Sequence, residues 1–445
     1  MNHSNVLQNL LRIARPFINN KFIIPTFSHI SKSLINPSTE ESFIQVIEGI
    51  SSDVDLAVNA ATDALHSPSW LSLNGADRRN ILLKIADSND KNLEKLALIE
   101  SLNVGNPLKD AKLEASESAE CFRFFAGYAD KLTGHTPCVD NKYRLYTIRE
   151  PIGICGLITS FNYPLLLASW KIAPSLACGN AIILKPSPQT PLTSLMLANT
   201  ISTETELPSG IFNVIPGDEI TGKSITEHKG IDKCSFTGSE QVGRKVLSAC
   251  SSSNLKRVTL ELGGKNAMIV FSDINIDKAV EDVYWATFAN SGQNCCAGSR
   301  LFLEENIHDE FLNKLKKKEL KILKSDNNKL LIGGKRFGDV GFFIEPTVFY
   351  DLDDSEYISQ KEIFGPVLSS KYAKFGLAAG VWTNNYLKVE KVVREIKVGT
   401  TWVNCYNLTP SYLPFGGRKF SGFGKDLGQE SINEFSFIKS VTYSL

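Results

Sequence analysis

Residues 152–191 read IGICGLITSFNYPLLLASWKIAPSLACGNAIILKPSPQTP, and their pattern is the strongest indication of the fold class. The runs IGICGLIT and AIILK are short and continuously apolar, which is typical of buried strands. Between them, PLLLASWKIAPSLA predicts a helix with Pro164 in its first turn, where a missing N–H is tolerated. A strand, a helix and a second strand in this order predict a parallel sheet.

The same alternation continues on both sides of this stretch. LTSLMLANTIS predicts a helix, IFNVIPG and CSFTGS predict strands, and EQVGRKVLSAC predicts another helix. Before it, the spacing is helical over 54–98 and 113–132, and FINNKFI at 17–23 predicts an edge hairpin. We therefore expect a parallel sheet with helices on both faces, which binds its ligands beyond the carboxyl ends of the strands.

The composition of the 445 residues excludes several classes of protein. The 48 basic residues balance the 48 acidic ones, so nothing in the net charge favours nucleic acid or anionic lipid. The nine cysteines are odd in number and scattered, which indicates reduced thiols inside a cell. They show no zinc spacing, so we expect no metal site. Polar residues and prolines interrupt the most apolar region, 152–184, so we expect no membrane span.

The N-terminus allows two interpretations. Residues 1–39 contain no acidic residue until Glu40 but do contain several basic residues and serines, as mitochondrial presequences do. The hairpin predicted at 17–23 belongs to the mature fold, however, so only residues 1 to about 15 are candidates for removal. We favour a cytoplasmic protein and keep a mitochondrial one as the alternative.

Two turns lie where the predicted sheet would bind a ligand. In FTGSEQVG, 236–243, Gly238 allows a tight turn and Ser239 can cap the next helix, whose first N–H groups attract phosphate. An ordinary helix cap explains the same letters. In RVTLELGG, Glu261 ends an alternating strand before two glycines, where it points either into a cleft or to solvent. The usual G-x-G-x-x-G fingerprint is absent.

The stretch SGQNCCAGSR, 291–300, places two adjacent cysteines among small and neutral residues. Together with FNYP, ILKPSPQTP, FTGS, LELGGKN, KEIFGPV, GTTWVN and LPFGGRKFSGFGKDLG, it stands in the order found in NAD(P)-dependent aldehyde dehydrogenases. The chain resembles this family from about residue 17 to 445. FNYPLLLASWKIAPSLACGN and KPSPQTP are most similar to the betaine-aldehyde and trimethylaminobutyraldehyde branch.

This resemblance implies an activity and a catalytic set. The activity is oxidation of a small aldehyde or amino-aldehyde to a carboxylic acid through a thiohemiacetal and a thioester. Cys295 matches the nucleophile, and Cys296 is only its neighbour in the loop. Asn162, with the backbone N–H of Cys295, matches the oxyanion donors. Glu261 matches the general base that activates the hydrolytic water. CoA-acylating relatives do not need such a base, so Glu261 argues against a CoA-acylating activity.

The resemblance also implies a dinucleotide site. Lys185 matches the contact with the adenosine ribose, 238–243 the pyrophosphate turn, and Glu362 with Phe364 the nicotinamide-ribose contacts. Pro188 stands where many NAD-preferring members carry a glutamate, so we expect NAD and leave NADP open. The full set of expected cofactor-binding residues is Ile158, Lys185, Gly238, Ser239, Val242, Gly243, Leu262, Glu362 and Phe364.

The implied fold is α/β, with a Rossmann-type cofactor domain, an α/β catalytic domain and a small β oligomerisation element in a homodimer or homotetramer. We expect the cofactor domain at 1–128 and 152–263, an oligomerisation hairpin at 129–151, the catalytic domain at 264–429 and a C-terminal oligomerisation strand at 430–445. Compared with the family, the chain is short at 311–333 and 367–375. This shortening predicts exposed apolar surface. It also allows an impaired pseudoenzyme or scaffold as the alternative function.

Overall fold

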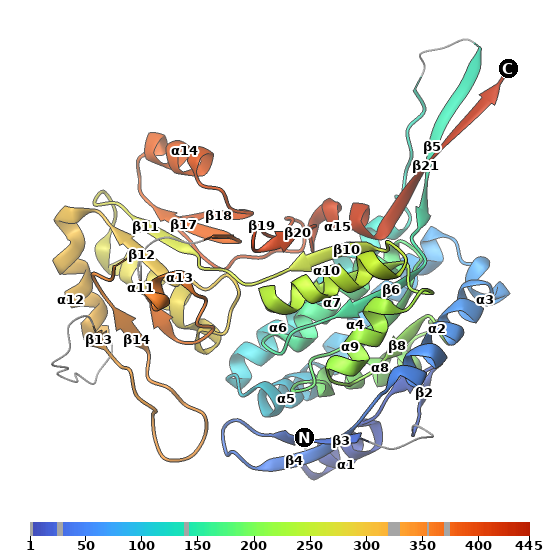
Figure 1. Cartoon of the computed structure of the whole chain (residues 1–445), viewed down its shortest axis with the longest axis horizontal. Coiled ribbons are helices and arrows are strands. Elements are labelled where there is room, and N and C mark those ends of the chain that lie inside the picture. The colour runs from blue at the N-terminus through green and yellow to red at the C-terminus, as the bar shows by residue number, and fades with distance from the viewer. Residues whose placement is uncertain (1–2, 25–29, 138–141, 319–329, 354–355, 369–373) are drawn as a thin grey trace.

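The structure is a computed structural model that describes residues 3–24, 30–137, 142–318, 330–353, 356–368 and 374–445 (Figure 1). Its main sheet has eight strands in the order β2-β1-β8-β7-β6-β9-β10-β20. The five strands from β8 to β10 are parallel, and their order along the sheet is that of a Rossmann fold. The strands are β1 (Phe17–Ile18), β2 (Lys21–Phe22), β6 (Ile154–Ile158), β7 (Ala181–Lys185), β8 (Phe212–Val214), β9 (Lys233–Thr237), β10 (Arg257–Glu261) and β20 (Gly422–Phe423).

Helices cover both faces of this sheet, as the sequence predicts. One face carries the helices α2, α9 and α10, and the other carries α7 and α8, with α4, α5 and α6 packed outside them. The central strands are buried along their whole length because they lie between these layers. The helices are α1 (His3–Ile13), α2 (Ser51–Leu65), α3 (Pro68–Leu71), α4 (Gly75–Lys91), α5 (Leu93–Val104), α6 (Leu108–Ala129), α7 (Pro164–Ala177), α8 (Leu192–Glu204), α9 (Glu219–Glu227) and α10 (Glu240–Ser253).

The predicted helical segments differ from the observed ones in their breaks. The sequence predicts continuous helical spacing over 54–98, whereas the structure has four separate helices there. The breaks arise because Pro68 starts α3 and Asn74 caps α4. The Asn74 side chain accepts hydrogen bonds from the N–H groups of Ala76 and Asp77 at 2.8 and 3.2 Å. The helix predicted at 113–132 runs over 108–129. The hairpin predicted at 17–23 is confirmed as β1 and β2, with β2 at the edge of the sheet.

A second, smaller core is built on the parallel sheet β12-β11-β17-β18. Next to it lie the short strands β13, β14 and β15. The edge strand β20 of the first sheet comes from the far end of the chain. Phe415 and Leu427 lie within the range 264–429 that was expected to form the catalytic domain, but their side chains are buried in the first core. The elements are β11 (Ala267–Val270), α11 (Ile276–Phe288), β12 (Arg300–Leu303), α12 (His308–Lys318), β13 (Leu330–Ile332), β14 (Thr347–Phe349), α13 (Tyr357–Gln360), β15 (Val367–Leu368), β16 (Phe375–Gly376), β17 (Ala378–Trp382), α14 (Tyr386–Glu395), β18 (Thr400–Val403), β19 (Arg418–Lys419) and α15 (Gly428–Phe435).

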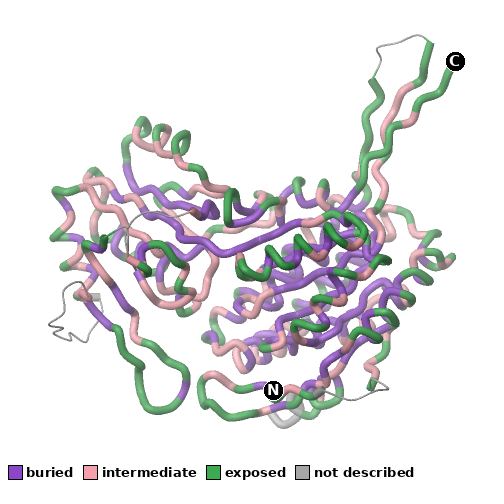
Figure 2. Tube along the Cα trace, viewed as in Figure 1, coloured by how far each residue is buried: buried purple, intermediate pink, exposed green. Residues whose placement is uncertain are grey.

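A two-stranded arm projects from the body of the molecule (Figure 1). It consists of β5 (Tyr143–Pro151) and β21 (Ser436–Ser444), which pair antiparallel over their whole length. Gly153, with φ of +126°, makes the bend at which the chain leaves the arm and enters β6. The arm is mostly exposed, whereas the first sheet is buried (Figure 2). A further pair, β3 (Ile30–Ile35) and β4 (Ser42–Glu48), lies near the N-terminus.

Some large apolar side chains outside the two shortened regions are exposed. Helix α14 has no buried residue, and Leu387 on it is 76% exposed. The connection between β13 and β14 exposes Phe342 and Ile344. Parts of both shortened regions, 319–329 and 369–373, lie outside the described residues.

Candidate active site

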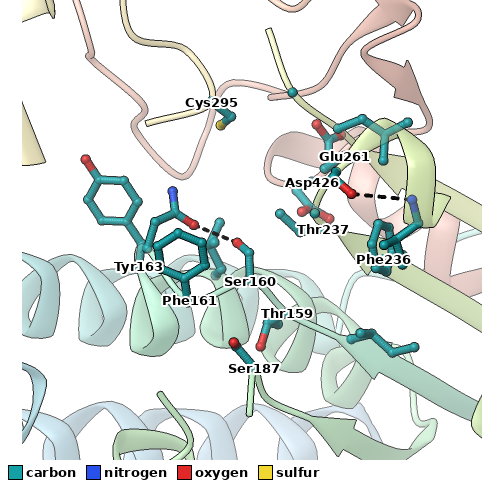
Figure 3. Close-up of a pocket in the computed structure, with 18 of the residues that line it drawn as sticks. Thr159, Ser160, Phe161, Tyr163, Ser187, Phe236, Thr237, Glu261, Cys295 and Asp426 are labelled. Atoms are coloured by element: carbon teal, nitrogen blue, oxygen red, sulfur yellow. Dashed lines mark hydrogen bonds between the residues drawn. The ribbon is translucent and has the colours of Figure 1, made fainter. Parts of the chain in front are cut away.

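The carboxyl ends of the parallel strands meet at a cavity of about 1470 Å³. Ile158 ends β6, Lys185 ends β7, Thr237 ends β9 and Glu261 ends β10, and all four line this cavity. The strand order reverses between β6 and β9, which is the topological switch point where open α/β sheets bind ligands. Figure 3 shows Cys295 on one wall, with Glu261 and Asp426 to one side of it and Phe161 and Tyr163 to the other.

The cavity gathers nearly all the residues that the sequence singled out. Gly243 is the exception. It lies inside α10, and a Cβ there would come within 2.6 Å of the Leu262 side chain, so it allows close helix–strand packing. The predicted residues that do line the cavity are Ile158, Asn162, Lys185, Gly238, Ser239, Val242, Glu261, Leu262, Cys295, Glu362 and Phe364.

The loop that carries Cys295 is fixed from behind by a buried asparagine. The side-chain amide of Asn266 donates to the carbonyl oxygens of Cys295 and Ala297, both at 2.9 Å. Gly264 lets the loop approach, because a Cβ there would lie 2.5 Å from the Cys295 carbonyl oxygen. Gly292, with φ of +68°, turns the chain into the loop. The backbone at position 295 is therefore held while its side chain faces the cavity.

The two adjacent thiols occupy different environments. Cys296 is 4% exposed, and its Sγ donates to Oδ1 of Asn294 at 3.1 Å and of Asn407 at 3.3 Å. Cys295 is less buried, and its Sγ lies 3.9 Å from the same Asn294 oxygen, a weak contact. The thiol of Cys296 and burial raise the pKa of Cys295 well above its ordinary value. Cys295 therefore presents a protonated thiol to the cavity and needs a base to become a nucleophile.

Asn162 lies at the turn between β6 and α7, with its side chain aimed at the cysteine loop. Its Nδ2 donates to the Gln293 carbonyl oxygen at 3.0 Å, and its Oδ1 accepts the Ser160 hydroxyl at 2.6 Å. The Asn290 side chain donates to the Asn162 carbonyl oxygen at 3.0 Å. These bonds orient the amide group of Asn162 toward the loop that precedes Cys295.

Glu261 is a buried carboxyl group without a hydrogen-bond donor. Neither of its side-chain oxygens has a partner in the described structure, and the residue is 7% exposed. Burial, with a smaller contribution from the Asp426 charge, raises the pKa of Glu261 well above its ordinary value. A raised pKa makes the ionised carboxylate a stronger proton acceptor, which suits a general base.

Beside Glu261 lies a buried ion pair that the sequence analysis missed. Lys171 Nζ lies 2.7 Å from Asp426 Oδ2, and the two side chains are 0% and 3% exposed. Lys171 also donates to the Ser235 hydroxyl at 3.1 Å. Two signals were present in the sequence, a charged residue inside the apolar stretch 152–184 and the acidic residue of GFGKDLG. Nothing local indicated that these residues, 255 positions apart, would meet.

The other half of the cavity has the groups that a dinucleotide requires. The Ser239 hydroxyl caps α10 by accepting the Val242 N–H at 3.4 Å, so the first turn of this helix opens onto the cavity. Lys185 is 5% exposed, and its Nζ donates to the Pro186 carbonyl oxygen at 3.3 Å. Burial lowers the pKa of Lys185 to about 8. A helix N-terminus and a buried lysine fit the phosphate and ribose groups of such a cofactor.

Glu362 is held against the Gly-Gly turn that follows Glu261. Its Oε1 accepts the Gly264 N–H at 2.9 Å, and burial raises the pKa of Glu362 to about 7. Gly263 is required here because a Cβ would overlap the Glu362 carboxylate. Phe364, with φ of +55°, packs edge-on against Phe161 with ring centroids 5.6 Å apart. These contacts place Glu362 and Phe364 between the cysteine loop and the dinucleotide half of the cavity.

Aromatic rings and carboxylates also line the cavity, and the sequence analysis did not single these residues out. Trp170 packs against Phe415 with centroids 5.4 Å apart. Trp285, 55% exposed, stands at the same cavity, which α6 lines with Asp110, Glu114 and Glu117. The sequence shows the helical spacing of these acidic residues, but it does not show that the face of α6 that carries them lines the cavity.

Comparisons with known proteins agree with this geometry. The model of the aldehyde dehydrogenase family matches residues 28–328 and 317–441. The mitochondrial aldehyde dehydrogenase of Rattus norvegicus is 40% identical over 476 residues, which cover 96% of this chain and 91% of that protein. Cytosolic aldehyde dehydrogenase 1 of Mus musculus is 40% identical over 475 residues, covering 96% of this chain and 94% of that protein. Relatives thus occur in both compartments.

Solved structures give the same result. An aldehyde dehydrogenase from Bacillus cereus in complex with NAD⁺ superposes with a TM-score of 0.92 at 33% identity, covering 97% of this chain and 96% of that one. Betaine aldehyde dehydrogenase from Staphylococcus aureus in complex with NAD⁺ gives a TM-score of 0.94 at 30% identity, with coverages of 99% and 97%. Similar proteins therefore span several kinds of aldehyde dehydrogenase.

The alignments also bear on the shortened regions. The alignment with the rat enzyme spans 476 residues although this chain has only 445, so the relative carries segments that are missing here. Within the described residues, no helix is long and apolar enough to cross a membrane. Over the same residues, no group of three or more His, Cys, Asp or Glu side chains is placed to hold a metal ion.

Proposed function

Because this chain belongs to the aldehyde dehydrogenase family, we propose that it oxidises an aldehyde to a carboxylic acid through a thiohemiacetal and a thioester on Cys295. One observation carries the proposal. The Cys295 thiol shares a cavity with the buried, donor-free carboxyl group of Glu261, at the switch point of a parallel sheet. A thiol beside an unpaired carboxylate is the arrangement that covalent catalysis at a carbonyl carbon requires.

In the first half-reaction, Glu261 takes the proton of the Cys295 thiol, and the sulfur attacks the aldehyde carbon. The carbonyl oxygen then becomes an oxyanion, which accepts hydrogen bonds from Asn162 Nδ2 and from the backbone N–H of Cys295. Asn162 gives up its bond to the Gln293 carbonyl oxygen to do this. Fixing the backbone of the cysteine loop through Asn266 keeps the second donor in place.

A nicotinamide dinucleotide, NAD or NADP, is the cofactor of this family and supplies the hydride acceptor when bound. In this chain Lys185 and Ser187 would hold the adenosine side, the first turn of α10 the pyrophosphate, and Glu362 with Phe364 the nicotinamide ribose. Pro188 lines the cavity without offering a carboxylate to the ribose hydroxyls. We propose NAD as the preferred form, with weak discrimination against NADP.

Before the second half-reaction, Glu261 releases the thiol proton to solvent. The carboxylate then accepts a proton from the water that attacks the thioester and returns it to the leaving Cys295 sulfur, so the carboxylic acid and the thiol are released. The neighbouring ion pair has opposite effects on this base, because the Asp426 charge raises the pKa of Glu261 and the Lys171 charge lowers it. The pair therefore adjusts the basicity of Glu261 while its own charges stay balanced in the interior.

For the substrate, we propose an amino-aldehyde or a related cationic aldehyde, in line with the resemblance to the betaine-aldehyde branch. The mouth of the cavity offers the carboxylates of Asp110 and Glu117 together with the rings of Tyr163 and Trp285. Carboxylates and aromatic faces both attract an ammonium group. Glu117→Gln is expected to lower kcat/KM for 3-aminopropanal about two- to fivefold and to leave that for propanal within twofold.

We propose that the arm of β5 and β21 joins subunits in a homodimer or homotetramer. Its exposed Phe437, Ile438 and Tyr443 would be covered in such an assembly. We retain the expected domain ranges as working boundaries. We also propose a cytoplasmic location, because Leu10 and Ile13 are buried, so a cut near residue 15 would open the first core. Size-exclusion chromatography and cell fractionation test these two points.

The shortened regions favour one second candidate, a folded pseudoenzyme that has lost turnover. The purified chain, mixed with NAD or NADP and a panel of aldehydes, decides between the two functions by the rate of NAD(P)H formation. Formation of NAD(P)H that is lost in Cys295→Ala supports the enzyme. Tight dinucleotide binding without any NAD(P)H from the panel contradicts it and supports the pseudoenzyme.

A further inference from the structure

Helix α7, which directly follows Asn162, is capped by a residue from a different helix. Its N-cap residue, Tyr163, makes no side-chain cap, and Pro164 has no N–H to offer. The next N–H, that of Leu165, is donated to Glu100 Oε1 at 3.1 Å in the protein interior. A carboxylate at this position satisfies an orphan donor and opposes the positive end of the helix dipole.

Glu100 lies on α5, is 1% exposed and faces a second buried carboxyl group, Glu114 on α6. Glu114 is 5% exposed, and its Oε1 accepts the Asn106 side-chain N–H at 2.7 Å. The remaining oxygen of each group, Oε2, has no donor in the described structure. Two buried carboxyl groups in contact cannot both be ionised, so one of them carries a proton that is hydrogen-bonded to the other.

The proton belongs on Glu114. Glu100 accepts a backbone N–H in addition to the contact with Glu114, and this bond favours its ionised form. Burial raises the pKa of Glu114 well above its ordinary value, with further contributions from the charge of Glu100 and smaller ones from Glu117 and Asp110 on its own helix. The result is an ionised Glu100 between the N–H of Leu165 and a protonated Glu114.

The cap bears on the active site because Asn162 stands immediately before the first turn of α7. The Asn162 side chain bonds the Gln293 carbonyl oxygen, and its carbonyl oxygen accepts the Asn290 side chain. On the other side of the turn, Tyr163 makes no side-chain cap and Pro164 has no N–H, so Leu165 offers the first N–H of the helix. The Glu100–Leu165 bond ties this N–H to α5, and the Ser118–Ser169 contact joins the next turn of α7 to α6.

We propose that Glu100 is a positioning residue, whose carboxylate, paired with the protonated Glu114, holds the start of α7 so that Asn162 can receive the oxyanion. The role rests on the proposed aldehyde oxidation, but the capping itself does not. Loss of the cap loosens the amide that stabilises the thiohemiacetal oxyanion, so it slows the first half-reaction without weakening dinucleotide binding.

The cap also titrates. Burial raises the pKa of Glu100 to about 7. Above that pH the carboxylate is ionised and caps α7, and below it the group gains a proton and the cap weakens. Glu100 faces the titratable group Glu114 on α6, and Glu114 in turn faces Asp110 and Glu117 on α6 and Tyr163 at the N-cap of α7. The rate of the first half-reaction is therefore expected to fall as the pH drops through about 7.

The test compares Glu100→Asp, Glu100→Gln and Glu100→Leu with the wild type. Glu94→Gln is the matched control, because Glu94 lies in the first turn of the same helix but is 61% exposed and paired with Lys112. The readouts are the rate of the first NADH burst from pH 5.5 to 8.5, the dissociation constant of NAD, the melting temperature and deuterium uptake of backbone amides 163–170.

The expected burst rates at pH 8 decrease from Asp to Gln to Leu. Glutamine keeps an acceptor but not the charge, and we expect a loss of about two- to fivefold. Leucine leaves the Leu165 N–H without a partner, and we expect a loss of about five- to hundredfold. The Asp variant partly restores the rate. The NAD dissociation constant stays within twofold in all variants, and uptake at 163–170 rises in the order in which the burst rate falls.

The pH profile separates this role from a general loss of stability. Glu362, whose pKa burial also raises to about 7, is present in every variant, so only the difference between the wild-type and Glu100→Gln profiles reports on position 100. A Gln variant with the wild-type burst rate and an unchanged profile overturns the proposal, even if its melting temperature is lower. If the wild type forms no NADH, the proposed function fails, and unchanged deuterium uptake in Glu100→Leu still overturns the capping.

Discussion

The two cores of this molecule differ in how completely their elements are covered. In the first core, strands β6, β7 and β9 are buried at every residue, between helical layers on both faces. In the second, β12 is only half-buried and α14 has no buried residue at all. The first core is closed to solvent, whereas one side of the second remains open.

The active site draws on both cores, but unequally. Lys185 and Glu261 end strands of the first core, and Asn162 lies in the turn between β6 and α7, so their positions follow from the burial of those elements. Cys295 and Glu362 come from loops that lead into the second core. The first core therefore sets the geometry of the proposed base and the proposed oxyanion donor, and the second contributes the proposed nucleophile through a clamped loop. Effects of substitutions on stability and on catalysis can therefore be measured separately in this molecule.

The largest effect is expected at the nucleophile. Cys295→Ala should abolish aldehyde oxidation, because no thiol then forms the thiohemiacetal, and should leave the melting temperature and NAD binding unchanged. Cys296→Ala is the matched control and should keep most of the activity, since the Cys296 side chain is 4% exposed and its Sγ donates to asparagine oxygens. Steady-state NADH formation and NAD titration measure both. Reversed phenotypes for the two cysteines would show that the wrong thiol has been assigned.

The next effect concerns the base at the edge of the first core. Glu261→Gln should stall after the first half-reaction, because an amide cannot accept the proton of the hydrolytic water. We expect a burst of at most about one NADH per site, followed by a steady rate lower by roughly 10²–10⁴-fold. If Glu261 also deprotonates Cys295, the burst itself slows.

Intact-mass measurement supplies the decisive readout for this variant, because an acyl adduct should accumulate on Cys295 even when the burst is slow. Glu434→Gln is a suitable control, since Glu434 is a partly buried carboxylate near Lys233 and away from the cavity. Turnover near the wild-type rate with no adduct would rule out Glu261 as the hydrolytic base.

The contrast between the cores is tested directly by stability. Phe122→Ala removes a fully buried ring from the first core and should lower the free energy of unfolding by about 3–5 kcal/mol. Leu387→Ala on α14 removes an exposed side chain and should change it by no more than about 0.5 kcal/mol. Urea denaturation measures both. Equal losses would mean that α14 is covered in solution by something that closes the second core.

The smallest effect concerns the choice of cofactor. Pro188→Glu places a carboxylate beside the expected adenosine ribose, where it can bind the ribose hydroxyls and repel a 2′-phosphate. The ratio of kcat/KM for NAD over NADP should rise about tenfold, the size of one hydrogen bond to a charged group. Pro186→Ala, in the same loop, is the control. An unchanged ratio would place the ribose away from residue 188.

Much of the first core could be predicted from the sequence because its signals are local. Short apolar runs such as AIILK have only one stable environment, the middle of a covered parallel sheet. The edge hairpin at 17–23 was predictable from two asparagines between apolar pairs, and both adopt positive φ. For the site, the motifs around Cys295, Glu261 and Asn162 indicated residues that the fold brings to one cavity.

What could not be predicted depends on contacts between distant segments. The ion pair of Lys171 with Asp426 and the carboxyl pair of Glu100 with Glu114 each need two elements to pack before either residue has a partner. Similarly, nothing in the two-residue sequence of β20, Gly422–Phe423, indicates that it pairs with β10. Periodicity specifies which face of an element is buried, and it does not specify which other element covers that face.

The pairing of β20 with β10 and of β21 with β5 also determines when these two strand edges are covered during synthesis. Strand β10 is made about 160 residues before its partner β20, an interval on the order of ten to thirty seconds at ribosomal rates. During that time the nascent chain displays an unpaired strand edge at β10, and β5 waits longer still for β21. In a newly made chain these two edges are therefore covered only after residues 422–444 have been synthesised.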